Sequence, residues 1–309
     1  QKVEAHPELD GLAKNTRKFN IIALRTLIHG GYLLSSGKYR ETPAQMYLRI
    51  AVHLTPLTTN FLAEVEQYFL LLLHGRISHA TPTMMNSGTK LGQLASCFIL
   101  STPKTEKAED VIGVLMQATK ISSMSGGIGV SGHTIRDIVK YAKLLNSTSQ
   151  MFDQNGKRPA VYNLYLEPWH PDIERFLELK NPVGNEDLRA RDLFYTLWIP
   201  DIFMKRLENK QKWSLMPVNQ GLEKLYGEEF EKLYCSLEQR GEGKEVDIEN
   251  LFLKILKSLQ ESGGPSIMFK DTVNRLSNHR SLGTIAGGNL CTEVVQYSDS
   301  QQTAVCNLA

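Results

Sequence analysis

Short apolar runs alternate with longer amphipathic ones along the middle of this chain. Residues 160–166 and 193–199 are apolar and rich in aromatic or branched side chains, which is typical of buried strands. Each run is followed by a segment with helical spacing, residues 172–180 and 201–209. Strands joined through helices favour parallel pairing, because a parallel pair needs a crossover connection. The chain is therefore predicted to be an α/β protein with a mainly parallel sheet or barrel.

Further segments extend this alternation on both sides. Residues 96–100 and 266–269 are predicted to be strands. The other predicted helices in this part of the chain are residues 107–120, 137–150, 227–240 and 248–261.

The first quarter of the chain has a different predicted secondary structure, because residues 15–75 are predicted to be helical. Thr42 followed by Pro43 is a typical helix start, and residues 61–73 form a strongly apolar helix. A polar turn is expected at residues 78–83. We therefore divide the chain into a helical region, residues 1–75, and an α/β region, residues 76–309.

Glycines at 127, 129 and 132 form a G-x-G-x-x-G pattern that allows two interpretations. A dinucleotide-binding fingerprint needs a strand before the pattern and a helix opening after it. The residues before Gly127 look helical instead. The favoured interpretation is a strand whose glycines let another backbone approach closely.

Asn289, Cys291 and Glu293 stand two residues apart in Gly-Gly-Asn-Leu-Cys-Thr-Glu-Val-Val. On an extended segment, side chains at this spacing share one face. The two valines favour an extended conformation. An amide, a thiol and a carboxylate are therefore predicted to face one cavity, the alternative being an edge strand with a polar face.

Composition excludes several classes of function. The 309 residues carry a formal net charge of +2, which gives no electrostatic basis for binding nucleic acid or a membrane. No apolar run approaches the roughly 20 residues of a membrane span, and the N-terminus does not resemble a signal peptide. The four cysteines contain no Cys-x-x-Cys pair, which argues against a zinc site, and their number in a chain of this size favours reduced thiols in a cytoplasmic protein.

Several separate stretches also match one family in the same order, and the match extends from about Phe19 to the last residue. On these stretches the chain resembles the catalytic large subunit of class I ribonucleotide reductase. The stretches are residues 80–83, 86–88, 93–98, 125–129, 157–159, 165–170, 189–194, 289–293 and 305–309.

The resemblance implies a fold and an extent. It implies half of a ten-stranded α/β barrel preceded by a helical layer, equivalent to the N-terminal half of the subunit without its ATP-cone. The second half of the barrel is expected in the same polypeptide or in a separate chain.

The resemblance also implies the catalytic roles. The reaction replaces a ribose 2′-hydroxyl with hydrogen, and Cys291 matches the cysteine that becomes a thiyl radical. Glu293 matches the base, and Asn289 matches the amide that holds the ribose hydroxyls. Cys97 and Cys306 match the redox pair that supplies two electrons and becomes a disulfide.

Substrate and effector residues follow from the same resemblance. Thr81, Thr83 and Ser96 match substrate-binding positions. The family's glycine- and asparagine-rich loop has no counterpart after Arg136. The positions that match effector-binding residues are Glu106, Arg136, Gln154, Lys157 and Arg158.

The implied partners complete the expectation. No cofactor is expected on this chain, since a metal-containing small subunit supplies the radical and ATP or dNTPs act as allosteric effectors. Other expected partners are ribonucleoside diphosphates, thioredoxin or glutaredoxin, and a second copy in a homodimer. The alternatives are a catalytically inactive homologue that binds nucleotide or protein, and a dinucleotide-binding oxidoreductase built on the glycine pattern.

Overall fold

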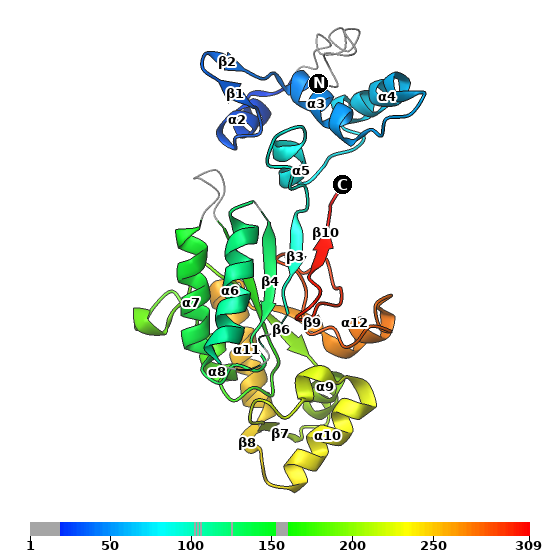
Figure 1. Ribbon diagram of the computed structural model, residues 1–309. Coiled ribbons are helices and arrows are strands. Elements are labelled where there is room, and N and C mark those ends of the chain that lie inside the picture. Colours follow the sequence, from blue (N-terminus) through cyan, green and yellow to red (C-terminus); the bar gives the residue numbers. More distant parts are fainter. Residues whose placement is uncertain (1–18, 102, 104, 106, 125, 153–159) are drawn as a thin grey trace.

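The computed structural model describes residues 19–101, 103, 105, 107–124, 126–152 and 160–309. A helical unit at one end contains α2 (Ile21–His29), α3 (Pro43–Leu54), α4 (Phe61–Leu73) and α5 (Thr81–Asn86) (Figure 1). The Thr42 side chain caps α3 in a capping box with Gln45, as its sequence predicts.

Two details of this unit differ from the prediction. Residues 35–40 form a two-stranded hairpin, β1 (Ser35–Ser36) and β2 (Tyr39–Arg40), so the stretch 15–75 is not wholly helical. The expected polar turn at 78–83 is also wrong in part, because α5 begins at Thr81 with Pro82 in its first turn. Proline at that position lacks only an N–H that the helix start leaves unpaired anyway.

The rest of the chain is built around a six-stranded sheet in the order β10-β3-β4-β5-β6-β9. All neighbouring strands are parallel except β10, which runs antiparallel to β3. The strands are β3 (Cys97–Ile99), β4 (Gly127–Ser131), β5 (Tyr162–Leu166), β6 (Phe194–Ile199), β9 (Ser266–Phe269) and β10 (Ala304–Cys306). The four predicted strands and the mainly parallel sheet are confirmed.

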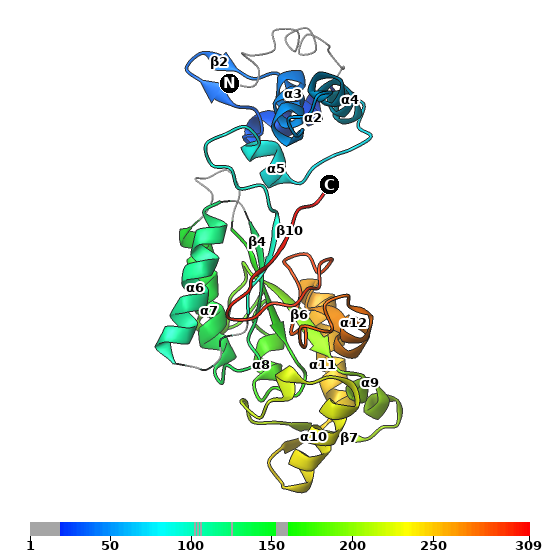
Figure 2. The ribbon, with the colours of Figure 1, turned by 45° about the vertical axis from the view of Figure 1, so that its right-hand side comes forward.

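Helices and strand crossovers cover one face of this sheet. Helices α6 (Ala108–Ser122), α7 (Ile138–Met151) and α8 (Ile173–Leu177) pack side by side, and α11 (Ile248–Ser262) packs against α8. The main core lies under them and includes Leu164 and Leu166 of β5. Figure 2 shows α6 and α7 on one side of the strands, with α12 (Lys270–Leu276) and the segment after it on the other.

One insertion was not predicted. Between α9 (Asp201–Glu208) and α11 the chain forms a separate two-stranded antiparallel sheet, β7 (Lys212–Leu215) and β8 (Lys244–Asp247). The predicted helix α10 (Gly227–Gln239) and the 3-10 helix η2 (Leu222–Lys224) lie within it, whereas the 3-10 helix η1 (Glu186–Leu188) precedes β6.

The glycine pattern lies in a strand and not in a phosphate loop. Gly127 and Gly129 belong to β4, and a Cβ on Gly129 would lie 1.7 Å from the carbonyl oxygen of Gly288. The close approach of a second backbone was the favoured interpretation, and it is confirmed. The dinucleotide-binding interpretation is wrong, because no helix opens at these glycines.

Candidate functional site

The segment 285–295 lies against the face of the sheet that the helices leave open. Asn163 and Tyr165 of β5 point to this face, since they alternate with core residues such as Leu164. Gly129 admits the segment because it has no side chain where the Gly288 carbonyl passes. The sheet therefore serves as the platform on which Asn289, Cys291 and Glu293 are presented.

Polar side chains of the sheet hold this segment by its backbone. The Ser131 hydroxyl donates to the Ala286 carbonyl at 2.9 Å. The Tyr165 hydroxyl donates to the Asn289 carbonyl at 2.6 Å, and burial holds the pKa of Tyr165 well above its usual range, so it stays a donor. The amide nitrogen of Asn163 donates to the Leu290 carbonyl at 2.9 Å.

Asn163 is itself oriented by the next strand. The Thr196 hydroxyl donates to the Asn163 side-chain oxygen at 3.0 Å, which leaves the nitrogen toward the Leu290 carbonyl. Sequence reasoning missed Asn163, Tyr165 and Thr196. Their signal was present, because polar groups interrupt two runs that otherwise read as buried strands.

The expected extended conformation of residues 289–293 is wrong. The Asn289 N–H donates to the Val294 carbonyl at 3.0 Å, and the Val294 N–H donates to the Asn289 side-chain oxygen at 3.1 Å. These bonds close a tight loop in which Thr292 has a φ of 70°. The three side chains consequently differ in exposure: Asn289 is buried, whereas Cys291 and Glu293 are exposed.

Asn289 is held in place but keeps one free donor. Its backbone carbonyl and its side-chain oxygen both accept hydrogen bonds. Its side-chain nitrogen is buried and donates to no described residue. A buried donor without an acceptor is costly, which favours a role in binding a ligand oxygen.

The two cysteines of the expected redox pair lie directly opposite each other. Cys97 of β3 and Cys306 of β10 are register partners in the antiparallel pair, and both thiols are free. Opposite residues in such a pair have Cα atoms about 4.5–5.5 Å apart and side chains on the same face. This spacing is within the range in which a disulfide forms.

Glu293 contacts this pair directly. The Cys97 thiol donates to the Glu293 carboxylate at 3.6 Å. Burial raises the pKa of the Cys97 thiol, and the Glu293 charge adds to the rise. The Ser96 hydroxyl, 3.5 Å from the sulfur, partly offsets this rise in the pKa. Cys97 therefore rests as a protonated thiol at neutral pH.

The expected substrate-binding residues lie near β10 and the residues that follow it. The Ser96 hydroxyl is 3.5 Å from the Cys97 sulfur and donates to the Cys306 carbonyl at 3.3 Å. The Ala80 N–H donates to the carbonyl of Leu308, two residues after the end of β10, at 3.0 Å. Ser96 and the start of α5 thus both contact the last residues of the chain, 306–308.

The two threonine hydroxyls already have partners. Thr83 is buried and donates to the Leu94 carbonyl at 2.9 Å. Thr81 lies 3.0 Å from the Tyr32 hydroxyl. Thr83 therefore positions the turn after α5, and its role in substrate binding stays a prediction.

Of the expected effector residues, the structure describes one. Arg136 is exposed, just before the Asp137 cap of α7. Glu106, Gln154, Lys157 and Arg158 lie outside the described residues. Cys235, to which no role was assigned, is half-buried on α10 and accepts a hydrogen bond from Arg206 at 3.7 Å.

Other site types find no support in the described part of the chain. Its helices include none with the length and apolar character needed to cross a membrane. The described His, Cys, Asp and Glu side chains form no group of three suited to a metal ion.

Comparison with known families identifies both parts of the chain. Residues 17–92 match the family model "Ribonucleotide reductase, all-alpha domain", and residues 95–309 match "Ribonucleotide reductase, barrel domain". The six-stranded sheet is thus part of a barrel domain preceded by helices, as predicted. The two matches meet between residues 92 and 95, whereas our division at residue 75 stays a prediction.

Curated relatives carry the same description. The ribonucleoside-diphosphate reductase large subunit of Danio rerio is 43% identical over 309 residues, covering 94% of this chain and 38% of the relative. The large chains of Neurospora crassa and Schizosaccharomyces pombe are 40% and 39% identical and cover 98% of this chain, but only 34% and 39% of their own lengths. The chain therefore spans less than two fifths of the length of these relatives.

Proposed function

This chain belongs to the ribonucleotide reductase large-subunit family, and from that premise we propose that it carries the catalytic residues of a ribonucleoside-diphosphate reductase. The observation that supports this best is local. A pair of opposed free thiols, Cys97 and Cys306, lies beside a carboxylate, Glu293, on the segment that also presents Cys291.

The proposed reaction begins at the exposed thiol. A small subunit that contains a metal generates the radical, and Cys291 as a thiyl radical takes the hydrogen atom from the ribose 3′-carbon. Glu293 takes the proton of the 3′-hydroxyl, and the free amide donor of Asn289 holds a ribose hydroxyl. The 2′-hydroxyl leaves as water.

The two facing thiols complete the reduction. Cys97 and Cys306 give two electrons and two hydrogens and become a disulfide, so that one hydroxyl is exchanged for one hydrogen and one water is formed. Cys291 then returns the hydrogen atom to the 3′-carbon, and Glu293 returns the proton to the 3′-oxygen. The raised pKa of Cys97 suits this role, because a protonated thiol can supply its hydrogen.

The remaining assignments follow the family. We place the protein in the cytoplasm, where thioredoxin or glutaredoxin would reduce the disulfide again, and in a homodimer controlled by ATP and dNTPs. The rest of the barrel would come from the same polypeptide or from a separate chain. The deoxyribonucleotides formed by the enzyme would supply DNA replication.

A single-turnover assay tests the role of the thiol pair. The prereduced native assembly, containing this chain, the rest of the large subunit and the small subunit, is mixed with ribonucleoside diphosphate without external reductant. We expect close to one deoxynucleotide per site together with a disulfide between Cys97 and Cys306. Cys306→Ser should abolish the product, whereas Cys235→Ser, a thiol outside the site, should leave it unchanged.

A second variant separates the catalytic proposal from the inactive homologue. Cys291→Ser should stop product formation while nucleotide affinity stays within about twofold, because the change removes the radical site but little volume. If the wild-type assembly binds nucleotide but forms no deoxynucleotide, the catalytic proposal is wrong and a binding role remains.

A further inference from the structure

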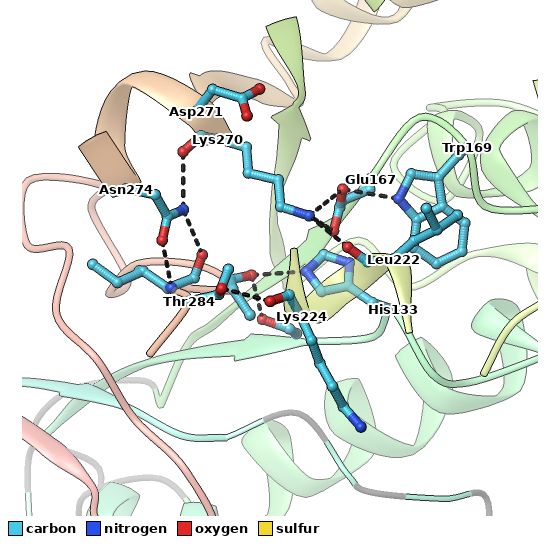
Figure 3. Close-up of polar contacts among 12 residues, drawn as sticks. His133, Glu167, Trp169, Leu222, Lys224, Lys270, Asp271, Asn274 and Thr284 are labelled. Carbon is cyan, nitrogen blue, oxygen red and sulfur yellow. Dashed lines mark hydrogen bonds and ion pairs between the residues drawn. The ribbon is translucent and has the colours of Figure 1, made fainter. Parts of the chain in front are cut away.

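The segment 285–295, which carries the candidate catalytic residues, is held at its beginning by helix α12. Asn274 of this helix is fully buried. The Ile285 N–H donates to the Asn274 side-chain oxygen at 2.7 Å, and the Asn274 side-chain nitrogen donates to the Ile285 carbonyl at 3.1 Å (Figure 3). One side-chain amide thus binds both backbone groups of a single residue.

The orientation of this amide is fixed. The Asn274 nitrogen also donates to the carbonyl of Lys270, one helical turn earlier, at 2.9 Å. Both ends of the amide are therefore used, as is usual for a buried asparagine. Ile285 lies outside the strands of the sheet, so the side chain supplies the pair of bonds that a neighbouring strand would otherwise make.

Helix α12 is itself bound to the rest of the fold. The Lys270 ammonium donates to both oxygens of Glu167 at 2.9 Å and to the Leu222 carbonyl at 3.0 Å. Lys270 and Glu167 are both fully buried. The Asp271 carboxylate accepts a hydrogen bond from the backbone N–H of Asp201, at the start of α9. The helix is thus a firm support for the asparagine that it carries.

Ile285 packs where the segment meets the sheet. It is 1% exposed and forms a small core cluster with Tyr165 of β5 and Trp198 of β6. Val273 of α12 and Val295 of the segment pack against the same cluster. The hydroxyl of this tyrosine donates to the segment four residues after Ile285. The position of Ile285 is therefore coupled to the group that orients the candidate site.

Two glycines separate Ile285 from the candidate catalytic residues. A Cβ on Gly287 would lie 2.9 Å from the Ser131 hydroxyl oxygen, and a Cβ on Gly288 would lie 2.9 Å from the Tyr165 hydroxyl oxygen. Larger residues are therefore excluded, and glycine leaves the backbone unusually free to rotate. Such a segment is fixed best when it is held on both sides of the glycines, by α12 before them and by β5 after them.

We propose that Asn274 is a positioning residue for the reaction: by holding both backbone groups of Ile285, it fixes where the segment places Cys291 and Glu293. This inference rests on the proposed function of those two residues. The hydrogen bonds of Asn274 go to backbone groups, so it acts through the segment and not on the ribonucleotide. Without the bonds to Ile285 the segment can shift, and a shift of about 1 Å at reacting atoms can lower turnover by about a hundredfold.

Asn274→Ser in the native assembly tests the proposal. A serine hydroxyl on a helix can still donate to the carbonyl of Lys270 four residues earlier, but the shorter side chain loses its bonds to Ile285. We expect kcat to fall at least about tenfold and KM to change less than about threefold, because Asn289 is only one of the proposed contacts to the ribonucleotide. The matched control is Asn209→Ser, which should keep the wild-type kcat. The exposed Asn209 makes the same bond to the carbonyl four residues earlier at 2.7 Å, but at the end of α9.

Hydrogen–deuterium exchange of the complete large subunit gives a second measurement that does not depend on activity. In Asn274→Ser the backbone amides of residues 285–295 should exchange at least about tenfold faster, while those of β5 change less than about twofold. Unchanged exchange in residues 285–295, or an unchanged kcat, would overturn the proposal. Equal acceleration in β5 would also overturn it, because Asn274 would then stabilise the fold in general.

The two measurements separate this inference from the proposed function. If the wild-type assembly forms no deoxynucleotide, the proposed function fails, and the exchange of residues 285–295 alone decides whether Asn274 holds the segment. If Asn274→Ser does not fold, Asn274→Asp replaces it, since aspartate has the same shape and keeps the acceptor for the Ile285 N–H but loses the donor to the Ile285 carbonyl. The same loss of kcat and faster exchange are expected, and wild-type values would refute the positioning role.

Discussion

Gly129→Ala is the sharpest perturbation of the sheet under the segment 285–295, which carries the candidate catalytic residues. The new Cβ would lie 1.7 Å from the Gly288 carbonyl oxygen, 2.8 Å from its carbonyl carbon and 3.0 Å from the carbonyl carbon of Asn289. An ordinary contact requires at least 3.4 Å. All three atoms are backbone, so no side-chain rotation relieves the overlap, and the segment must retreat by about 1.7 Å.

The expected loss of stability follows from the hydrogen bonds that this movement of the segment weakens. It would stretch the hydrogen bonds of 2.6 Å from Tyr165 to the Asn289 carbonyl and of 2.9 Å from Asn163 to the Leu290 carbonyl. Two buried bonds contribute about 1 kcal/mol each, and overpacking adds about 1–3 kcal/mol. We therefore expect Gly129→Ala to lower the free energy of unfolding by about 3–5 kcal/mol.

Denaturant unfolding measures the change in stability, and the rate of deoxynucleotide formation measures the effect on the candidate site. Displacing Cys291 by more than 1 Å should lower turnover by about a hundredfold or more in the fraction that stays folded. Gly113→Ala is the matched control, because nothing lies within 4 Å of its new Cβ and it lies within helix α6. It should raise stability by up to about 1 kcal/mol. If the free energy of unfolding of Gly129→Ala is within about 0.5 kcal/mol of the wild-type value, the tight contact between Gly129 and Gly288 is wrong.

Two further predictions concern buried charge. Lys270→Met should lower the free energy of unfolding by about 3–5 kcal/mol, because the fully buried Glu167 loses its ion pair. Adding Glu167→Gln should recover most of this loss in denaturant unfolding. A double variant no more stable than the single variant would contradict the reasoning. Burial lowers the pKa of His133 from 6.5 to about 4, so between these values the unfolded chain binds a proton that the native protein does not, and stability falls as the pH falls. This residue alone should cost about 2 kcal/mol at pH 5 relative to pH 8, and urea unfolding of His133→Gln should show a correspondingly smaller loss.

The sequence alone was sufficient to predict the parallel strands and most helices of the α/β region. Strands β5, β6 and β9 were predicted within two residues because apolar runs of strand length are local signals, and the helices between them follow from spacing. The role of Gly129 was also readable, since glycine in a strand is a poor choice unless another backbone comes close.

The conformation of the active-site segment could not be read in this way. Val294 and Val295 favour an extended chain, but the hydrogen bonds between Asn289 and Val294 close a loop instead. The sheet stabilises this loop through Tyr165 and Asn163, which donate to its carbonyls. Propensity is a weak preference, and several tertiary hydrogen bonds outweigh it.

The redox pair shows where local sequence information ends. Residue types and family resemblance pointed to Cys97 and Cys306, but only the antiparallel pairing of β10 with β3 sets them opposite each other. The hydrogen bonds from β4 and β5 to the segment 285–295 bring Glu293 to 3.6 Å from the Cys97 thiol. Which distant strands pair, and in which register, depends on how the whole sheet buries its faces, and no short stretch of sequence carries that information.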